Sequence, residues 1–166
     1  MAVSKSDPIV IIGFDCGGGG LFKTVDAGKT WETLEYPDYV SALAISPHDS
    51  QTVFAGTGKG IFQSNDGARS WVPLDQYKGI NILALSFDEQ GILHASTSTF
   101  GLSRSSDLGK TWEKINSPDL TITSIAVDSQ NKIIYVTGYS PGGFQEVYKS
   151  SDDGDSWQLV GTNKEP

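Results

Sequence analysis

The stretch Ser105-Ser-Asp107-Leu-Gly109-Lys-Thr111-Trp112 decides the fold, because the chain contains this eight-residue pattern four times. The pattern is a hydroxyl residue, any residue, Asp, any residue, Gly, any residue, a hydroxyl residue and Trp. The other copies are Thr24-Val-Asp26-Ala-Gly28-Lys-Thr30-Trp31, Ser64-Asn-Asp66-Gly-Ala68-Arg-Ser70-Trp71 and Ser150-Ser-Asp152-Asp-Gly154-Asp-Ser156-Trp157. All four tryptophans of the chain stand in these copies, about 40 to 45 residues apart, which indicates an internal structural repeat.

Three short segments precede each copy of the pattern. In the third repeat they are Leu83-Ala84-Leu85, Leu93-His-Ala95 and Gly101-Leu-Ser103, and a fourth segment opens at the Trp. Four short strands in a repeat of this length are typical of a β-propeller blade. The Ala-centred triplet suits the innermost strand, because blades crowd together near the axis. A helical repeat is excluded, since no segment shows sustained 3.6-residue periodicity.

The sequence therefore predicts an all-β protein, a β-propeller with four four-stranded antiparallel blades. We expect one domain over residues 1–166, with blades at about 1–36, 40–76, 80–116 and 121–162. The first repeat offers only a short inner strand. We therefore expect two copies of the chain to pair and close an eight-bladed ring, or the chain to be cut from a longer propeller.

The eight-residue box has a physical explanation as a turn between two strands. The hydroxyl and carboxylate oxygens can accept backbone amides that lack ladder partners, and Gly supplies a positive φ. The Trp then packs on the neighbouring sheet. We therefore predict structural roles for Asp26, Trp31, Asp66, Trp71, Asp107, Trp112, Asp152 and Trp157. The second box has Ala68 in the Gly position, so we expect its turn to be shifted or strained.

These residues resemble the Asp-box, or BNR, repeat over nearly the whole chain. That repeat occurs in sialidases, xyloglucan-cleaving glycosidases, sortilin-type receptors and photosystem II assembly factors. The resemblance implies the propeller fold and places the boxes on the rim away from the usual ligand face. It does not select a function, because the family contains both enzymes and binding proteins.

Composition excludes several classes of function. The formal net charge is −8, which disfavours nucleic acids and anionic membrane surfaces as partners. Sialidases clamp their substrate with three arginines, and this chain has only Arg69 and Arg104, so we expect no sialidase activity. Cys16 is the single cysteine, and His48 and His94 lack ligand-spaced partners, so we expect no metal and no cofactor. No apolar run is long enough to insert into a membrane, and the start of the chain lacks a signal-peptide core; the compartment stays unknown.

The loops opposite the boxes carry the candidate ligand-binding residues. Aromatic side chains with few charges suit stacking on a sugar or anchoring of a protein partner. The candidates are Tyr36, Tyr39, Tyr77, Phe100, Tyr139, Asp15, Asp38 and Asp75, with Phe144 beside them. We expect a non-catalytic binding or scaffolding propeller. The alternative is a glycosidase, or part of one, that uses a pair of loop carboxylates among Asp15, Asp38, Asp75, Asp119 and Glu146.

Overall fold

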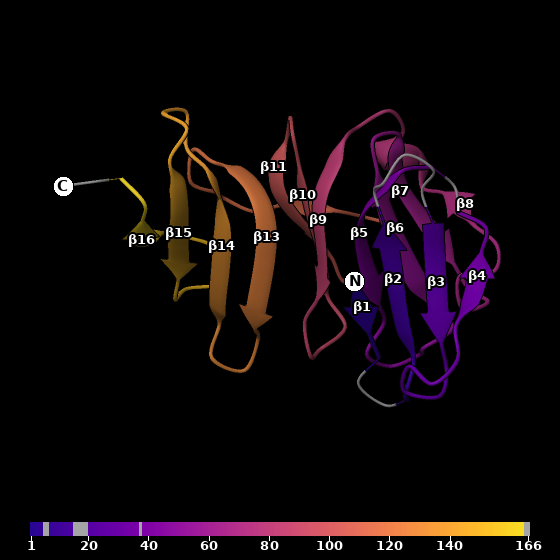
Figure 1. Cartoon of the computed structure of the whole chain (residues 1–166). Coiled ribbons are helices and arrows are strands. Elements are labelled where there is room, and N and C mark those ends of the chain that lie inside the picture. Colours follow the sequence, from indigo (N-terminus) through magenta and orange to yellow (C-terminus); the bar gives the residue numbers. More distant parts are fainter. Residues whose placement is uncertain (5–6, 15–19, 37, 165–166) are drawn as a thin grey trace.

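The computed structural model describes residues 1–4, 7–14, 20–36 and 38–164. These residues form four sheets of four strands, which we name blades 1 to 4 (Figure 1). Blade 1 contains β1 (Ala2–Val3), β2 (Val10–Phe14), β3 (Gly20–Thr24) and β4 (Glu32–Leu34). Blade 2 contains β5 (Val40–Ile45), β6 (Val53–Thr57), β7 (Gly60–Ser64) and β8 (Val72–Pro73). Blade 3 contains β9 (Ile82–Phe87), β10 (Leu93–Thr97), β11 (Gly101–Ser105) and β12 (Glu113–Lys114). Blade 4 contains β13 (Thr121–Asp128), β14 (Ile133–Tyr139), β15 (Gln145–Ser150) and β16 (Gln158–Thr162).

Within each blade, every strand pairs antiparallel with the next strand along the chain. The first strands β1, β5, β9 and β13 contact one another in this order, so they lie nearest the axis and the fourth strands lie outermost. One short 3-10 helix, Asp75–Tyr77, is the only helical element among the described residues. The predicted fold class is confirmed: the chain is an all-β arc of four antiparallel propeller blades.

The core lies between the blades. Three apolar clusters fill the space between blades 1 and 2, 2 and 3, and 3 and 4. Because side chains alternate along a strand, each inner blade contributes residues to two clusters. In β6, for example, Val53 and Ala55 face blade 1 whereas Phe54 faces blade 3. The outer faces of blades 1 and 4 lie at the two ends of this arc (Figure 1).

Candidate functional site

The box turns hold their aspartates by the same local hydrogen bonds in all four blades. In the third box Asp107 accepts the Thr111 amide at 2.9 Å and the Thr111 hydroxyl at 2.6 Å. Ser105 donates to Asp107 and accepts the amide of Gly109, both at 2.8 Å. These bonds favour the charged carboxylate and lower the pKa of Asp107 from 3.8 to about 2. Corresponding bonds are present at Asp26, Asp66 and Asp152. The aspartates are therefore used within their own turns.

The box tryptophans differ in burial. Trp71, Trp112 and Trp157 are half-buried, and each packs in the cluster shared with the preceding blade. Within the single chain, Trp31 departs from the expectation that every box Trp lies between blades, because it is 43% exposed. The physical reason is that blade 1 has no preceding blade in this chain.

The second box keeps the geometry of the others despite its altered sequence. The two residues after the Asp have positive φ in every box, and here they are Gly67 at 69° and Ala68 at 73°. Ser64 still accepts the amide at this place, from Ala68, at 2.8 Å. The turn is therefore not shifted. A residue with a Cβ disfavours the left-handed region, but every box holds one such residue there: Ala27, Leu108 and Asp153 at the first position, and Ala68 at the second. The second box therefore exchanges the places of its glycine and its other residue.

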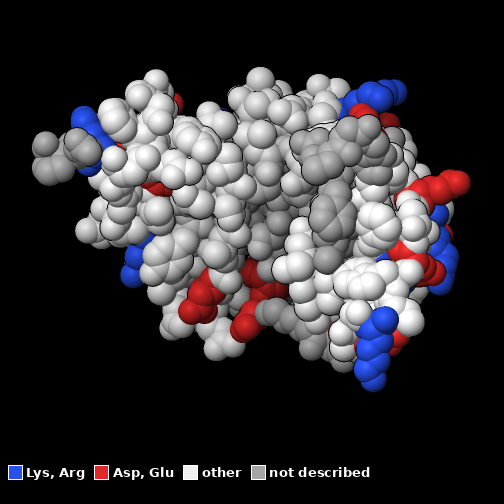
Figure 2. Space-filling view, in the orientation of Figure 1, with Lys and Arg blue, Asp and Glu red and all other residues white. Residues whose placement is uncertain are grey.

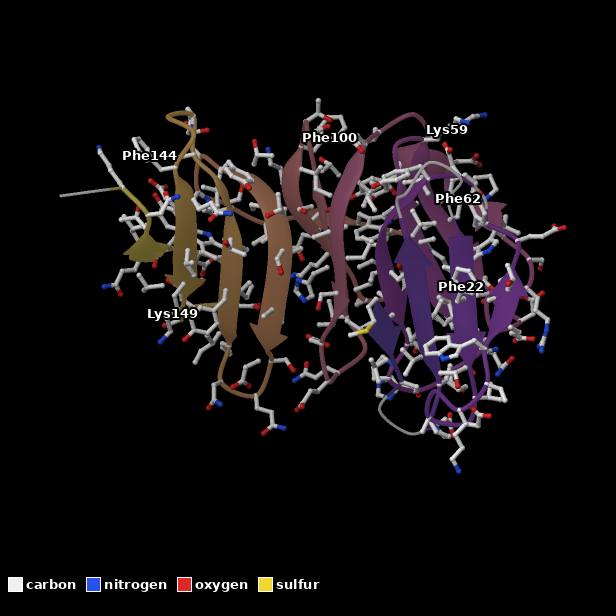
Figure 3. The ribbon with its side chains drawn as sticks, in the orientation of Figure 1. Phe22, Lys59, Phe62, Phe100, Phe144 and Lys149 are labelled. Carbon is white, nitrogen blue, oxygen red and sulfur yellow. The ribbon has the colours of Figure 1, made fainter. Side chains whose placement is uncertain are left out.

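Opposite the boxes lies the loop face, where the loops between second and third strands and the linkers between blades emerge. Figure 3 shows Lys59, Phe100 and Phe144 at this end of the molecule. Five of its aromatic residues are at least one-third exposed: Tyr36, Tyr39, Phe100, Tyr139 and Phe144.

Tyr77 differs from these exposed aromatic residues. It is buried, its hydroxyl is hydrogen-bonded to Ser103, and its ring centroid lies 4.8 Å from that of Trp112. Tyr77 thus serves the core between blades 2 and 3.

A cleft of about 490 Å³ opens on the loop face between blades 3 and 4. Two exposed aromatic residues and a set of hydroxyl groups form much of its wall. The lining residues are Thr97, Ser98, Thr99, Phe100, Gly101, Lys114, Ser117, Pro118, Asp119, Leu120, Thr121, Tyr139 and Pro141. Of the predicted ligand residues, the structure brings Phe100 and Tyr139 together here. Figure 2 shows that the visible surface over blade 4 carries few charged side chains.

Local geometry positions the two aromatic residues. The hairpin between β10 and β11 is closed by the Phe100 amide, which donates to the Thr97 hydroxyl at 2.8 Å. Gly101 follows with a φ of +70°, and a Cβ there would lie 2.8 Å from the Ser117 hydroxyl oxygen. Tyr139 ends β14 opposite Thr121, and its hydroxyl accepts a hydrogen bond from the side-chain amide of Gln145 at 3.2 Å. The aromatic side chains therefore project from ordered strand ends.

A smaller hollow of about 280 Å³ adjoins the cleft on the side of blade 2. It is lined by Gln76, Tyr77, Ile80, Phe100, Ser103, Trp112 and Lys114. Phe100 and Lys114 belong to both walls, so a long ligand can pass from one hollow into the other. Lys114 and Ser117 were not among the sequence candidates, because nothing in the box pattern marks the residues that follow the Trp.

The predicted carboxylates that the structure describes have different surroundings. Asp38 is ion-paired with Lys59 at 3.1 Å and accepts the Tyr39 amide, which lowers its pKa. Asp75 opens the short 3-10 helix, and Asp15 lies outside the described residues. Asp119 is the one carboxylate in the described wall of the cleft.

Two of the predicted carboxylates, Asp119 and Glu146, act on Tyr148, and Glu146 lies in strand β15 instead of in a loop. Burial raises the pKa of Tyr148, and a hydrogen bond with Glu146 and the charge of Asp119 raise it further.

Within the described ranges, no three His, Cys, Asp or Glu side chains are placed to hold a metal ion. The described part of the chain also contains no helix that is long and apolar enough to cross a membrane.

Comparison with known proteins finds similarity in structure only. No protein-family model and no curated protein matches the sequence. A GH74 enzyme from Niastella koreensis superposes with a TM-score of 0.79 and 18% identity, covering 96% of this chain and 29% of that chain. The GH74 xyloglucanase from Xanthomonas campestris gives 0.80 and 16%, covering 99% and 31%. YCF48 bound to D1 peptide gives 0.63 and 20%, covering 89% and 48%. The chain thus spans less than a third of these GH74 enzymes and about half of YCF48, and these matches show the propeller fold alone.

Proposed function

We propose that this protein is a non-catalytic binding propeller that holds a neutral carbohydrate chain in the cleft between blades 3 and 4. The observation that carries this function is the pairing of two exposed aromatic residues, Phe100 and Tyr139, across a wall rich in hydroxyl groups. Aromatic faces stack on sugar rings, and hydroxyl groups exchange hydrogen bonds with sugar hydroxyls. The structural similarity to a xyloglucanase supports a sugar polymer as the ligand.

Isothermal titration of the purified chain with xyloglucan oligosaccharides tests this function. We expect saturable binding that weakens at least tenfold in Phe100→Ala and in Tyr139→Ala, because each change removes a stacking platform. Tyr36→Ala is the matched control, since Tyr36 is an exposed aromatic residue of the loop face outside the cleft wall. Equal losses in all three variants would place the ligand elsewhere on the loop face. Binding of a peptide instead of the sugar would favour a protein partner, as in the YCF48 complex.

A glycosidase activity is the second candidate function. It is favoured by Asp119 in the wall of the cleft and Glu146 on β15, which both act on Tyr148, and by the GH74 neighbours. Glycoside hydrolysis requires two carboxylates that flank the bond. Release of reducing ends from xyloglucan by the wild-type chain, abolished in Glu146→Gln, would establish this activity. No release above the rate of Glu146→Gln would leave the binding function.

The proposed function also includes association of the chain with a second copy of itself. Support comes from the two ends of the arc, where large apolar side chains are exposed on blade faces that are buried elsewhere in the molecule. Contiguous apolar surface of this kind marks protein interfaces in soluble proteins. A mass near twice 17.8 kDa in solution would support this association.

A further inference from the structure

Each blade has a forward face, which contacts the blade that follows, and two positions on it are fully covered in blades 1 to 3. Corresponding positions in the four blades are found by counting along the paired second and third strands from the first hydroxyl residue of each box. The position on the second strand is occupied by Ile11, Phe54 and His94, and that on the third strand by Leu21, Ile61 and Leu102. In blade 4 the same positions hold Tyr135 and Val147, which are 41% and 36% exposed. The forward face of blade 4 is therefore built as an interface and has no blade against it in this chain.

The backward face, which contacts the preceding blade, shows the complementary pattern. Its second-strand position is occupied by Val53, Leu93 and Ile134, all fully buried. In blade 1 the corresponding residue is Val10, which is only half-buried, and the box Trp of this face is the exposed Trp31. In blades 2, 3 and 4 the box Trp packs against the forward face of the preceding blade. Blade 1 has the same Trp, but no blade of this chain lies against it.

A polar contact repeats across two of the internal interfaces. The residue directly before the box is basic in blades 1 and 3, and its side chain reaches the residue after the box Asp of the next blade. Lys23 donates to the carbonyl of Gly67 at 3.0 Å, and Arg104 donates to the carboxylate of Asp153 at 2.6 Å. Blade 4 has Lys149 at this position, opposite Tyr135 in the strand register, with its ammonium 5.9 Å from the centre of the Tyr135 ring. Figure 3 labels Lys149 near the lower end of β15. The matching acceptor is the carbonyl of Ala27, directly after Asp26 in the first box.

We infer that the forward face of blade 4 in one copy docks on the backward face of blade 1 in a second copy, twice, with Lys149 reaching Ala27 and Trp31 covered by Tyr135 and Val147. This inference rests on the proposed self-association and specifies its faces. A two-fold axis satisfies both contacts at once, and the resulting eight blades lie within the usual range for a propeller. The partner is a second copy because both halves of the repeated interface lie on one polypeptide. Blade 4 carries the apolar residues and the basic side chain of a forward face, and blade 1 carries the apolar residues and the box of a backward face.

Light scattering or sedimentation of the 166-residue chain with two complementary variants tests this docking. Trp31→Glu spoils only the backward face of blade 1, and Val147→Glu spoils only the forward face of blade 4. Alone, each variant spoils both contacts of the ring, so we expect a monomer with an unchanged circular dichroism spectrum. Mixed in equal amounts, they retain one intact pair of faces, so we expect the dimer to return. Val72→Glu, at an exposed position on β8, is the control and stays dimeric.

Several outcomes would overturn the inference. The inference would be overturned by a wild-type chain that is monomeric at about 50 µM, or by assemblies larger than a dimer. A dimer that persists in Trp31→Glu would also overturn it, but would leave self-association through another surface in place. Failure of the mixed variants to pair would do so too. Lys149→Met should raise the dimer Kd about tenfold, and an unchanged Kd would remove the polar contact from the interface. Because the cleft lies within one copy, Trp31→Glu is expected to bind xyloglucan oligosaccharides as the wild type does. A wild-type chain that does not bind the sugar would overturn the proposed ligand and leave the proposed dimer untouched.

Discussion

Trp112 and Trp31 occupy the same position of the same motif and have different surroundings. Both indoles donate to the carbonyl of the box Gly three residues earlier, at 3.1 and 3.2 Å. Trp112 then packs against Tyr77 in the cluster between blades 2 and 3, whereas Trp31 stands exposed at the end of the arc. The turn is therefore specified by its own eight residues, and the burial of its Trp is specified by a neighbouring blade.

The largest expected effect comes from acid, because protonation weakens the hydrogen bonds within all four box turns at once. Hydrogen bonds lower the pKa values of Asp26, Asp107 and Asp152 from 3.8 to about 2. Folding thus favours the charged form, so this stabilisation is complete above about pH 4 and is lost as the pH falls through about 2. Circular dichroism between pH 5 and pH 1.5 should show unfolding in this window. Asp107→Asn should be less stable at pH 7 and less sensitive to acid, and a stability that stays flat from pH 4 to pH 2 would contradict the local role.

Substitution of the two tryptophans separates the local from the non-local contribution. Trp112→Ala should lower the free energy of unfolding by about 3 kcal/mol, because the change leaves a cavity beside Tyr77. Trp31→Ala should cost less than about 1 kcal/mol, because surface changes act weakly. Urea unfolding, with both changes made in the monomeric Val147→Glu background, measures the two values. Equal losses would mean that the turn, and not the neighbouring blade, accounts for the contribution of Trp.

The repeat is the reason that the fold could be predicted from the sequence. Four copies of a box in register with apolar segments define sixteen short strands before any coordinate is known. The residue type at individual positions of the repeat was less predictable. His94 occupies a buried position that Ile11 and Phe54 fill elsewhere, with the Asp88 carboxylate 3.7 Å from its Nε2. Burial lowers the pKa of His94, and no periodicity in the sequence indicated this exception.

The candidate site was less predictable, because its walls come from segments that do not repeat. Phe100 and Tyr139 were expected on the loop face, but their meeting in one cleft depends on the linker from Ser117 to Leu120. Tyr77 was expected with them. The 3-10 helix Asp75–Tyr77 instead carries it into the interface between blades 2 and 3, where Ser103 is small enough to leave room for its ring and binds its hydroxyl. Linker conformation thus decides which aromatic residues face solvent.

Lys23 and Lys149 give the smallest and most selective test of the difference between internal and outer blade faces. The Lys23 ammonium is buried against the second box and donates to Gly67, and burial is the main cause of its lowered pKa. Lys23→Met keeps the length of the side chain and leaves the carbonyl of Gly67 without this donor. We expect a loss of about 1 kcal/mol, because the cost of an unpaired buried acceptor is partly offset by removing a buried charge. Lys149→Met should leave the unfolding free energy unchanged in the monomeric Val147→Glu background, since its blade face has no box opposite it within one chain. Urea unfolding of both variants measures the difference, and a loss at Lys149 equal to that at Lys23 would show that the lysine stabilises its own strand and not the contact between blades.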